Sequence, residues 1–292
     1  MTRWRIGQVT VTKLVEREVT GGTRHLLPQA TRGAARAIEW LHPHFADGDG
    51  RLRTSVHLLV VDAPDARVVV DTGLGNDKTL RLVPEWNRLS TPLLSDLTAA
   101  GVAPESVAAV VCTHLHVDHV GWNTRLVGTE WVPTFPNAEY IIARKEYDHW
   151  AAEYDERLDR PAYFHDSVEP VASQTHLVDG DHAVCDGVRL VPTPGHTPGH
   201  VSVVIESAGQ CAIITGDALH HPIQVAHPDW SSPSDWDPLR AASTRHALLS
   251  EAVGVNALLI GSHFAGVTAG RVRPSADPDE AFTLVTEKET RT

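Results

Sequence analysis

The 292-residue chain contains little cysteine and has an excess of acidic over basic residues. It has only three cysteines and no Cys-x-x-Cys pair, which argues against a disulfide framework and indicates a reducing compartment, so we expect a cytoplasmic location. The chain has 25 lysines and arginines against 37 acidic residues, a net charge of -12. Because phosphate backbones and anionic lipids are bound by clustered cations, we expect neither nucleic acid nor membrane as a partner.

Long hydrophobic runs are also missing from the sequence. No stretch is apolar over the length that a membrane-spanning helix needs, and residues 1–12 lack the apolar centre of a secretory signal. A soluble enzyme that binds a small-molecule substrate fits this composition.

Histidine, in contrast, is abundant and locally clustered. The segment Thr113-His-Leu-His-Val-Asp-His119 brings three imidazoles and one carboxylate together, directly after the apolar run 107–112. Alternation along a strand predicts that His114 and His116 point to one side, and a turn at Val117 directs Asp118 and His119 to a neighbouring point. We interpret this as a metal-binding signature in which two adjacent divalent ions fit better than one. Zinc is the first expectation, and Mn, Fe or Co would suit the same donors.

Four further short apolar runs end in a candidate ligand, often beside a glycine. Buried strands that stop at one rim, with functional groups on the loops beyond, are typical of α/β sites. The four runs and the residues that follow them are 68–70 before Asp71, 188–193 before His196, 211–215 before Asp217, and 256–260 before His263. Because these residues are distant in sequence and must converge, we expect residues 1–292 to form a single domain.

Together these motifs resemble the metallo-β-lactamase superfamily over residues 56–264. The resemblance implies an α/β fold, a four-layer αββα sandwich of two mixed sheets with helices outside. It also implies that Asp217 bridges two metal ions. By the same resemblance, His114, His116 and His196 hold one ion, and Asp118, His119 and His263 hold the other. Asp71 is interpreted as a carboxylate that orients a ligand histidine, and the alternative is an aspartate that forms a turn.

A bridged pair of divalent ions predicts hydrolytic chemistry. Two cations bridged by Asp217 and a solvent molecule lower the pKa of that water toward ~7, which supplies a hydroxide at neutral pH. Asp118 and Asp217 are therefore the expected catalytic carboxylates, and the charge balance favours a transition state that gains negative charge. We expect a neutral, fairly hydrophobic ester-like substrate.

The substrate class depends on weaker motifs. Segments 121–124, 135–138 and 216–222 look most like the branch that contains lactonases and methyl parathion hydrolase-like enzymes, so a lactone ranks slightly ahead of an aryl phosphotriester. A hydrolytic dehalogenase of chlorinated aromatics is similar at its metal motifs. An iron-dependent sulfur dioxygenase of the same superfamily is the alternative of another class. Such an enzyme uses one set of metal ligands, so the complete second set in this chain speaks against it.

Eight tryptophans dominate an aromatic content of 6%, and several lie near the motifs. Residues 20–53 are expected to form an irregular N-terminal arm that covers the site or a partner subunit in a homodimer. The candidate pocket residues are Trp40, Phe45, Trp122, Phe135, His220 and Phe264.

Local signals predict further elements. Residues 90–100 are expected to be helical with Ser90 or Thr91 as the cap, and Asp237 followed by a proline starts another helix that ends near Gly254. His200 is expected to hydrogen-bond to the backbone near the site. The polar tail, residues 276–292, is expected to be frayed.

Overall fold

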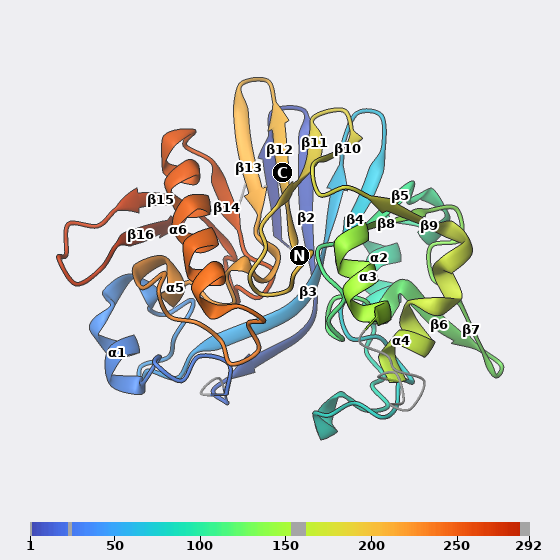
Figure 1. The fold of residues 1–292 in the computed structure, drawn as a ribbon, viewed down its shortest axis with the longest axis horizontal. Coiled ribbons are helices and arrows are strands. Elements are labelled where there is room, and N and C mark those ends of the chain that lie inside the picture. The colour runs from blue at the N-terminus through green and yellow to red at the C-terminus, as the bar shows by residue number, and fades with distance from the viewer. Residues whose placement is uncertain (1, 23–24, 153–161, 287–292) are drawn as a thin grey trace.

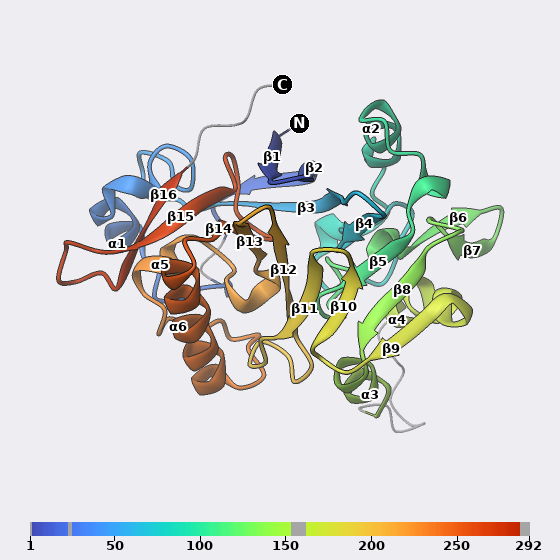
Figure 2. The same cartoon turned by 90° about the horizontal axis from the view of Figure 1, so that it is seen from above.

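The computed structural model describes residues 2–22, 25–152 and 162–286. Two seven-stranded sheets pack face to face, and helices cover the outer face of each sheet, as Figures 1 and 2 show. The four-layer αββα sandwich implied by the resemblance is therefore confirmed.

The first sheet has the order β1-β2-β3-β4-β5-β8-β9. Its four leading strands are antiparallel, while β4, β5, β8 and β9 run parallel to one another. Its strands are β1 (Thr2–Ile6), β2 (Val9–Thr20), β3 (Arg53–Asp62), β4 (Arg67–Val70), β5 (Ala109–Cys112), β8 (Glu139–Ala143) and β9 (Thr175–Val178). A separate hairpin joins β6 (Thr124–Val127) to β7 (Glu130–Pro133).

The second sheet follows chain order from β10 to β16, with one parallel pair, β13 and β14. Its strands are β10 (His182–Cys185), β11 (Val188–Pro192), β12 (Val201–Ser207), β13 (Gln210–Ile214), β14 (Leu258–Ile260), β15 (Ala269–Pro274) and β16 (Phe282–Thr286). The prediction of a frayed tail is wrong for β16, which pairs with β15 and buries Leu284. Residues 287–292 of that tail lie outside the described residues.

Six α-helices are present in the described part of the chain. They are α1 (Arg32–Ala37), α2 (Leu93–Ala99), α3 (Arg144–Ala152), α4 (Ala162–Ser167), α5 (Ile223–Ala226) and α6 (Pro238–Gly254). Short 3₁₀ turns are η2 (Glu39–Leu41), η3 (Pro84–Trp86), η4 (Pro104–Ser106), η5 (Gly121–Asn123), η6 (Glu169–Gln174) and η7 (Gly216–Ala218). None of the helices that the structure describes is long and apolar enough to cross a membrane.

The two predicted helices differ in how they begin. Asp237 caps α6 by accepting from the Arg240 backbone N–H, as its position before a proline predicts. The cap expected for α2 is wrong, because Pro92 occupies the N-cap position and makes no side-chain cap bond. The Thr91 hydroxyl instead lies within hydrogen-bond distance of Asn76 and Glu16, which join it to a neighbouring loop.

Three apolar clusters correspond to the three interfaces of the sandwich. Because side chains alternate along a strand, Val111 of β5 points into the cluster between the sheets, while Val110 points into the cluster beneath α2. The third cluster lies between the outer face of the second sheet and α6. Each fully buried aliphatic side chain in these clusters contributes about 1.5–3 kcal/mol to the free energy of unfolding.

The N-terminal arm, residues 20–53, contributes described residues to this third cluster. Leu27, Leu41 and Phe45 are completely buried there with residues of α5 and α6. Trp40 is half-buried, and its Nε1 donates to Glu280 Oε2 at 3.0 Å. The arm therefore covers the outer face of the second sheet, where Figure 1 shows α1 beside α5 and β16.

Candidate metal centre

The candidate ligands lie just beyond the ends of five buried strands. Strands β4, β5, β11, β13 and β14 end within four residues of Asp71, His114, His196, Asp217 and His263, as the apolar runs predicted. One expectation is corrected. His114 and His116 do not alternate along a strand, because β5 ends at Cys112 and both residues lie in the loop that follows.

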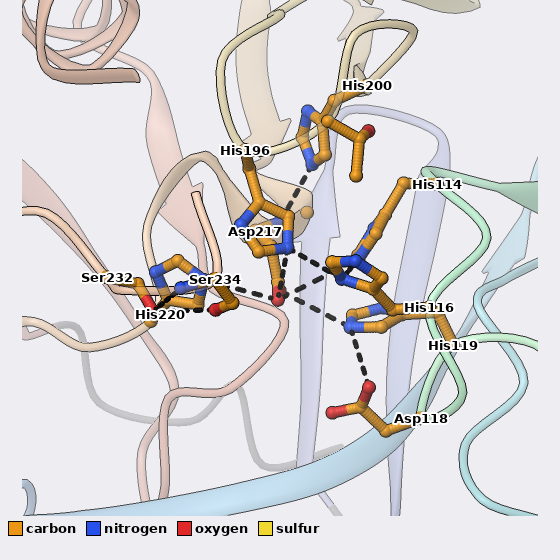
Figure 3. Close-up of polar contacts among 12 residues, drawn as sticks. His114, His116, Asp118, His119, His196, His200, Asp217, His220, Ser232 and Ser234 are labelled. Atoms are coloured by element: carbon orange, nitrogen blue, oxygen red, sulfur yellow. Dashed lines mark hydrogen bonds and ion pairs between the residues drawn. The ribbon is translucent and has the colours of Figure 1, made fainter. Parts of the chain in front are cut away.

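Three histidines converge in a first group. His114 Nε2 lies 3.0 Å from His116 Nδ1, and His116 Nδ1 lies 2.8 Å from His196 Nε2. His116 and His196 are 80 residues apart in the chain. Their loops follow β5 and β11, which belong to different sheets. Figure 3 shows the three rings directed at a common point.

A second group lies beside the first. His119 Nε2 lies 3.1 Å from His263 Nε2, and Asp118 Oδ2 lies 3.5 Å from the same His263 nitrogen. Ligand atoms of these residues all lie within 4.8 Å of one another.

Asp217 stands between the two groups with one oxygen toward each. Its Oδ2 lies 3.5 Å from His196 Nε2 and 3.9 Å from His114 Nε2. Its Oδ1 lies 3.1 Å from His263 Nε2 and 3.4 Å from His119 Nε2. The carboxylate therefore has the placement that a bridge between two cations requires.

The backbone of Asp217 is held by His200. The Asp217 N–H donates to His200 Nε2 at 2.9 Å, so the expected backbone hydrogen bond of His200 is confirmed. Gly216 has φ +53°, and a Cβ there would lie 2.5 Å from His200 Nε2. Only glycine allows this close approach before the bridging residue.

The donor set fits divalent ions such as zinc on geometric grounds. Zinc–nitrogen bonds of about 2.0–2.1 Å give a tetrahedron with edges of about 3.3 Å. The separations of 2.8–3.1 Å between facing imidazole nitrogens lie within a few tenths of an ångström of that edge. Asp217 Oδ1 is buried and has no hydrogen-bond partner among the described residues, which leaves its lone pairs available to a cation.

Three histidines direct their Nδ1 atoms at acceptors outside the ligand groups. His119 Nδ1 lies 2.9 Å from Asp71 Oδ2, His196 Nδ1 lies 2.9 Å from Asp235 Oδ1, and His263 Nδ1 lies 3.0 Å from the Ser55 carbonyl oxygen. An N–H that donates outward leaves the Nε2 lone pair free to ligate.

The role expected for Asp71 is thus consistent with its contacts, and Asp235 is an orienting carboxylate that the sequence did not indicate. Asp235 lies in the loop before α6, its Oδ2 lies 3.4 Å from Arg245 Nη1, and both side chains are buried. No motif marks it, because its partner His196 is 39 residues away.

Charges inside the centre favour cations at the second group. Burial alone would lower the pKa of His263, but the Asp217 and Asp118 carboxylates outweigh it and raise that pKa to about 9. Burial would raise the pKa of Asp217, yet His263 and His119 outweigh it and hold that pKa well below its ordinary value. Within the first group, burial lowers the pKa of His114 well below its ordinary value, which keeps its lone pair available.

His220 lies at the edge of the centre, as Figure 3 shows. Its Nε2 lies 3.6 Å from Asp217 Oδ2, and its ring centroid lies 4.6 Å from that of His196. The side chain is buried, and within the part of the chain that the structure describes neither ring nitrogen has a hydrogen-bond partner. His220 is also one of a further group of potential metal ligands with His196 and Asp217.

The aromatic residues expected in a substrate pocket have other positions. Trp122 and Phe135 are 3% and 0% exposed in the cluster beneath α2, and Trp122 Nε1 donates to Glu16 Oε1. The prediction that they line a pocket was wrong. Trp122 and Phe135 follow the candidate ligands closely in sequence, but this does not determine on which face of the sheet their side chains lie. Trp40 is fastened to Glu280 within the third cluster, which gives it a packing role.

Two aromatics lie closer to the centre. Phe264 directly follows His263, and its ring meets that of Phe45 edge to face at 6.1 Å between centroids. Both rings are fully buried. The two rings are therefore part of the packed core next to His263 and do not form an open surface.

Comparison with known proteins identifies a matching family and several relatives. The family described as the metallo-beta-lactamase superfamily matches residues 50–263. An N-acyl homoserine lactonase of Bacillus cereus is 29% identical over 168 residues, which cover 53% of this chain and 60% of the relative. Metallo-beta-lactamase domain-containing protein 1 of Xenopus laevis is 31% identical over 170 residues, 57% of this chain and 59% of the relative. The chain thus spans about 60% of the length of such curated relatives.

Solved structures extend the likeness over the full chain. A dizinc quorum-quenching lactonase, AidC, in complex with a product, superposes with a TM-score of 0.79 at 21% identity, covering 99% of this chain and 98% of the other. The hydrolase AbOPH gives the same TM-score, identity and coverage. At this identity the likeness establishes the fold. Because the family model matches most of the chain, the chain belongs to the metallo-β-lactamase superfamily.

Proposed function

We propose that this chain is a dinuclear metal-dependent hydrolase. The observation that carries the proposal is the placement of Asp217, whose two oxygens face two separate groups of ligands. Such a carboxylate would hold two cations at neighbouring positions. The first group, with Asp217, is His114, His116 and His196; the second, with Asp217, is Asp118, His119 and His263.

When bound, the cations would supply Lewis acidity toward water and toward the oxygen of the scissile bond. The chain supplies the geometry for this chemistry. Asp118 and Asp217 provide two negative charges in the centre, while Asp71 and Asp235 hold imidazole protons outward. Burial of His114, His196 and Asp217 strengthens the electrostatic interactions at the centre. His220 would present an unpaired ring nitrogen to the substrate.

A lactone is the proposed substrate class. Relatives that match half of this chain are N-acyl homoserine lactonases, and a solved structure with the same fold is a dizinc lactonase with a product bound. An aryl phosphotriester is the runner-up, because the same charge balance would stabilise its transition state. A dehalogenase and an iron-dependent sulfur dioxygenase rank lower, and the complete second ligand group disfavours the dioxygenase, which needs only one metal set.

The test is a hydrolysis panel of lactones, aryl esters, phosphotriesters, thioesters and β-lactams, run with metal quantification. We expect two metal ions per chain, with zinc first among them, and the highest kcat/KM on lactones. His116→Ala should lose metal and activity together, because His116 Nδ1 faces both other nitrogens of the first group. The matched control is His246→Ala, which removes an exposed histidine bonded to Asp229. Full activity in metal-free His116→Ala would contradict the proposal.

Three further features belong to the same proposal. A cytoplasmic location is supported by the three cysteines, all of which are free. One domain over residues 1–292 is supported by the central cluster, to which both sheets contribute. A homodimer stays a prediction, and sedimentation of the purified chain would test it.

A further inference from the structure

One buried carboxylate outside the ligand groups contacts both loops of the first group. Glu146 lies in the first turn of α3 and is fully buried. Its Oε1 accepts from the Leu115 N–H at 3.0 Å and from Trp150 Nε1 at 2.7 Å. Its Oε2 accepts from the Thr197 hydroxyl at 2.6 Å and from the Gly199 N–H at 3.1 Å.

These donors lie among the first-group ligands. Leu115 stands between His114 and His116, and Thr197 directly follows His196. The indole of Trp150 also packs edge to face against the His116 ring, with centroids 5.4 Å apart. We propose that Glu146 is a positioning residue that holds these two loops together, so that the three histidines converge on one cation; this rests on the proposed function.

The chemistry of the four donors requires a carboxylate at this position. Leu115, Gly199 and Trp150 each present an N–H, which cannot accept a hydrogen bond. A glutamine has one oxygen and one NH2 group. If its NH2 faced Leu115 and Trp150, two fixed donors would oppose it. If it faced Thr197, the hydroxyl could turn to accept, but the Gly199 N–H would lose its partner.

The backbone packing at Gly199 also supports this role. A Cβ on Gly199 would lie 2.1 Å from the Glu146 nitrogen and 2.5 Å from its Cα. The loop that carries His196 therefore rests directly on the first turn of α3. Backbone packing at Gly199 and the hydrogen bonds of the Glu146 carboxylate thus join the same loop to α3.

The chain offers a matched control in Glu16 of β2. Like Glu146, Glu16 accepts from four donors of three kinds. They are the backbone N–H groups of Leu74 and Gly75, the indole of Trp122 and the hydroxyl of Thr91. Among the residues that the structure describes, none of the partners of Glu16 lies in the loops that carry His114, His116 and His196. Glu16→Gln therefore reproduces the chemical damage without the connection to the three histidines.

The experiment compares Glu146→Gln with Glu16→Gln in the full chain. Zinc affinity is measured by competition with a chelator, beside Tm, kcat and KM. We expect Glu146→Gln to bind one of its two ions about 10- to 100-fold more weakly. Excess zinc should restore kcat at an unchanged KM, which a purely structural defect would not allow. Glu16→Gln should lower Tm to a similar extent and keep both ions at wild-type affinity.

Thr197→Val is the second variant, for the case in which Glu146→Gln does not fold. It removes one of the four donors with little change in volume, and we expect a several-fold weakening of one ion. Wild-type zinc affinity in a folded Glu146→Gln variant would overturn the proposal. If that variant does not fold, wild-type zinc affinity in Thr197→Val would overturn it. An equal loss of zinc affinity in Glu16→Gln would also overturn it. A wild-type chain that binds two ions and hydrolyses nothing in the panel would refute the proposed function alone.

Discussion

Replacing Asp71 by asparagine is expected to weaken one metal ion through His119. Asp71 has φ +54°, a left-handed conformation that asparagine tolerates, so the backbone after β4 should be retained. Its Oδ1 accepts from the Thr113 N–H at 2.8 Å. Its Oδ2 accepts from the Thr113 hydroxyl and lies 2.9 Å from His119 Nδ1. The substitution thus changes one acceptor and one charge at nearly constant size.

The effect follows from the tautomer of His119. If the amide oxygen keeps the Thr113 N–H, the NH2 group faces His119 Nδ1, which must then accept. The ring proton moves to Nε2, the atom that lies 3.1 Å from His263 Nε2 and 3.4 Å from Asp217 Oδ1. A protonated Nε2 cannot ligate. If the amide is turned the other way, a buried backbone N–H loses its partner instead.

The expected magnitude is a 10- to 100-fold weaker affinity for one ion, about 1.4–2.8 kcal/mol. Zinc titration against a chelator measures the affinity, and nitrogen NMR of the zinc-loaded protein reports which ring nitrogen of His119 carries the proton. Asp62→Asn is the control, because it removes a carboxylate from the same sheet that pairs with Arg67. Two ions at wild-type affinity in Asp71→Asn, with the proton still on Nδ1, would refute the reasoning.

His220→Phe should keep two ions and lower kcat/KM about tenfold, which corresponds to the loss of one hydrogen bond to the substrate. An unchanged kcat/KM would show that His220 does not contact the substrate. Loss of metal would show that His220 is a ligand. Burial lowers the pKa of Lys78 to about 7 despite Asp166 beside it, so the unfolded chain binds more protons between pH 7 and 10.5. Lys78 thus makes the free energy of unfolding rise with pH there, by up to about 1.4 kcal/mol per unit. In Lys78→Met, the free energy of unfolding measured in urea should rise less steeply with pH over this range. An identical pH dependence in both chains would contradict the prediction. Trp40→Phe loses the bond to Glu280 and should lower stability by about 1 kcal/mol with kcat/KM unchanged; a changed KM for bulky substrates would return Trp40 to the pocket.

The candidate ligands could be proposed from sequence because their signal is local. Three histidines and an aspartate within residues 114–119 form an unusual pattern, and short apolar runs mark the strand ends that deliver the others. The N-cap of α6 was equally local, since Asp237 acts on a backbone N–H only three residues away. Short-range geometry of this kind depends little on the rest of the fold.

The pocket residues could not be recognised in the same way. Trp122 lies three positions after His119, yet it points into the cluster beneath α2 and bonds to Glu16, 106 residues earlier in the chain. Adjacency in sequence to a ligand says nothing about the face of the sheet on which a side chain lies. The cap expected for α2 was wrong for a related reason, because Asn76 and Glu16 of neighbouring segments engage the Thr91 hydroxyl.

The sequence by itself determined the kind of donors, their order and the strand ends that carry them. Only the tertiary structure decided that Asp217 turns one oxygen to each ligand group, and that Asp71, Asp235 and Glu146 stand behind particular ligands. In sequence, Asp71 lies 48 residues from His119, Asp235 lies 39 residues from His196, and Glu146 lies 31 residues from Leu115. Which carboxylate meets which histidine depends on how the two sheets pack, because packing rather than local propensity places residues so distant in the chain within hydrogen-bond reach.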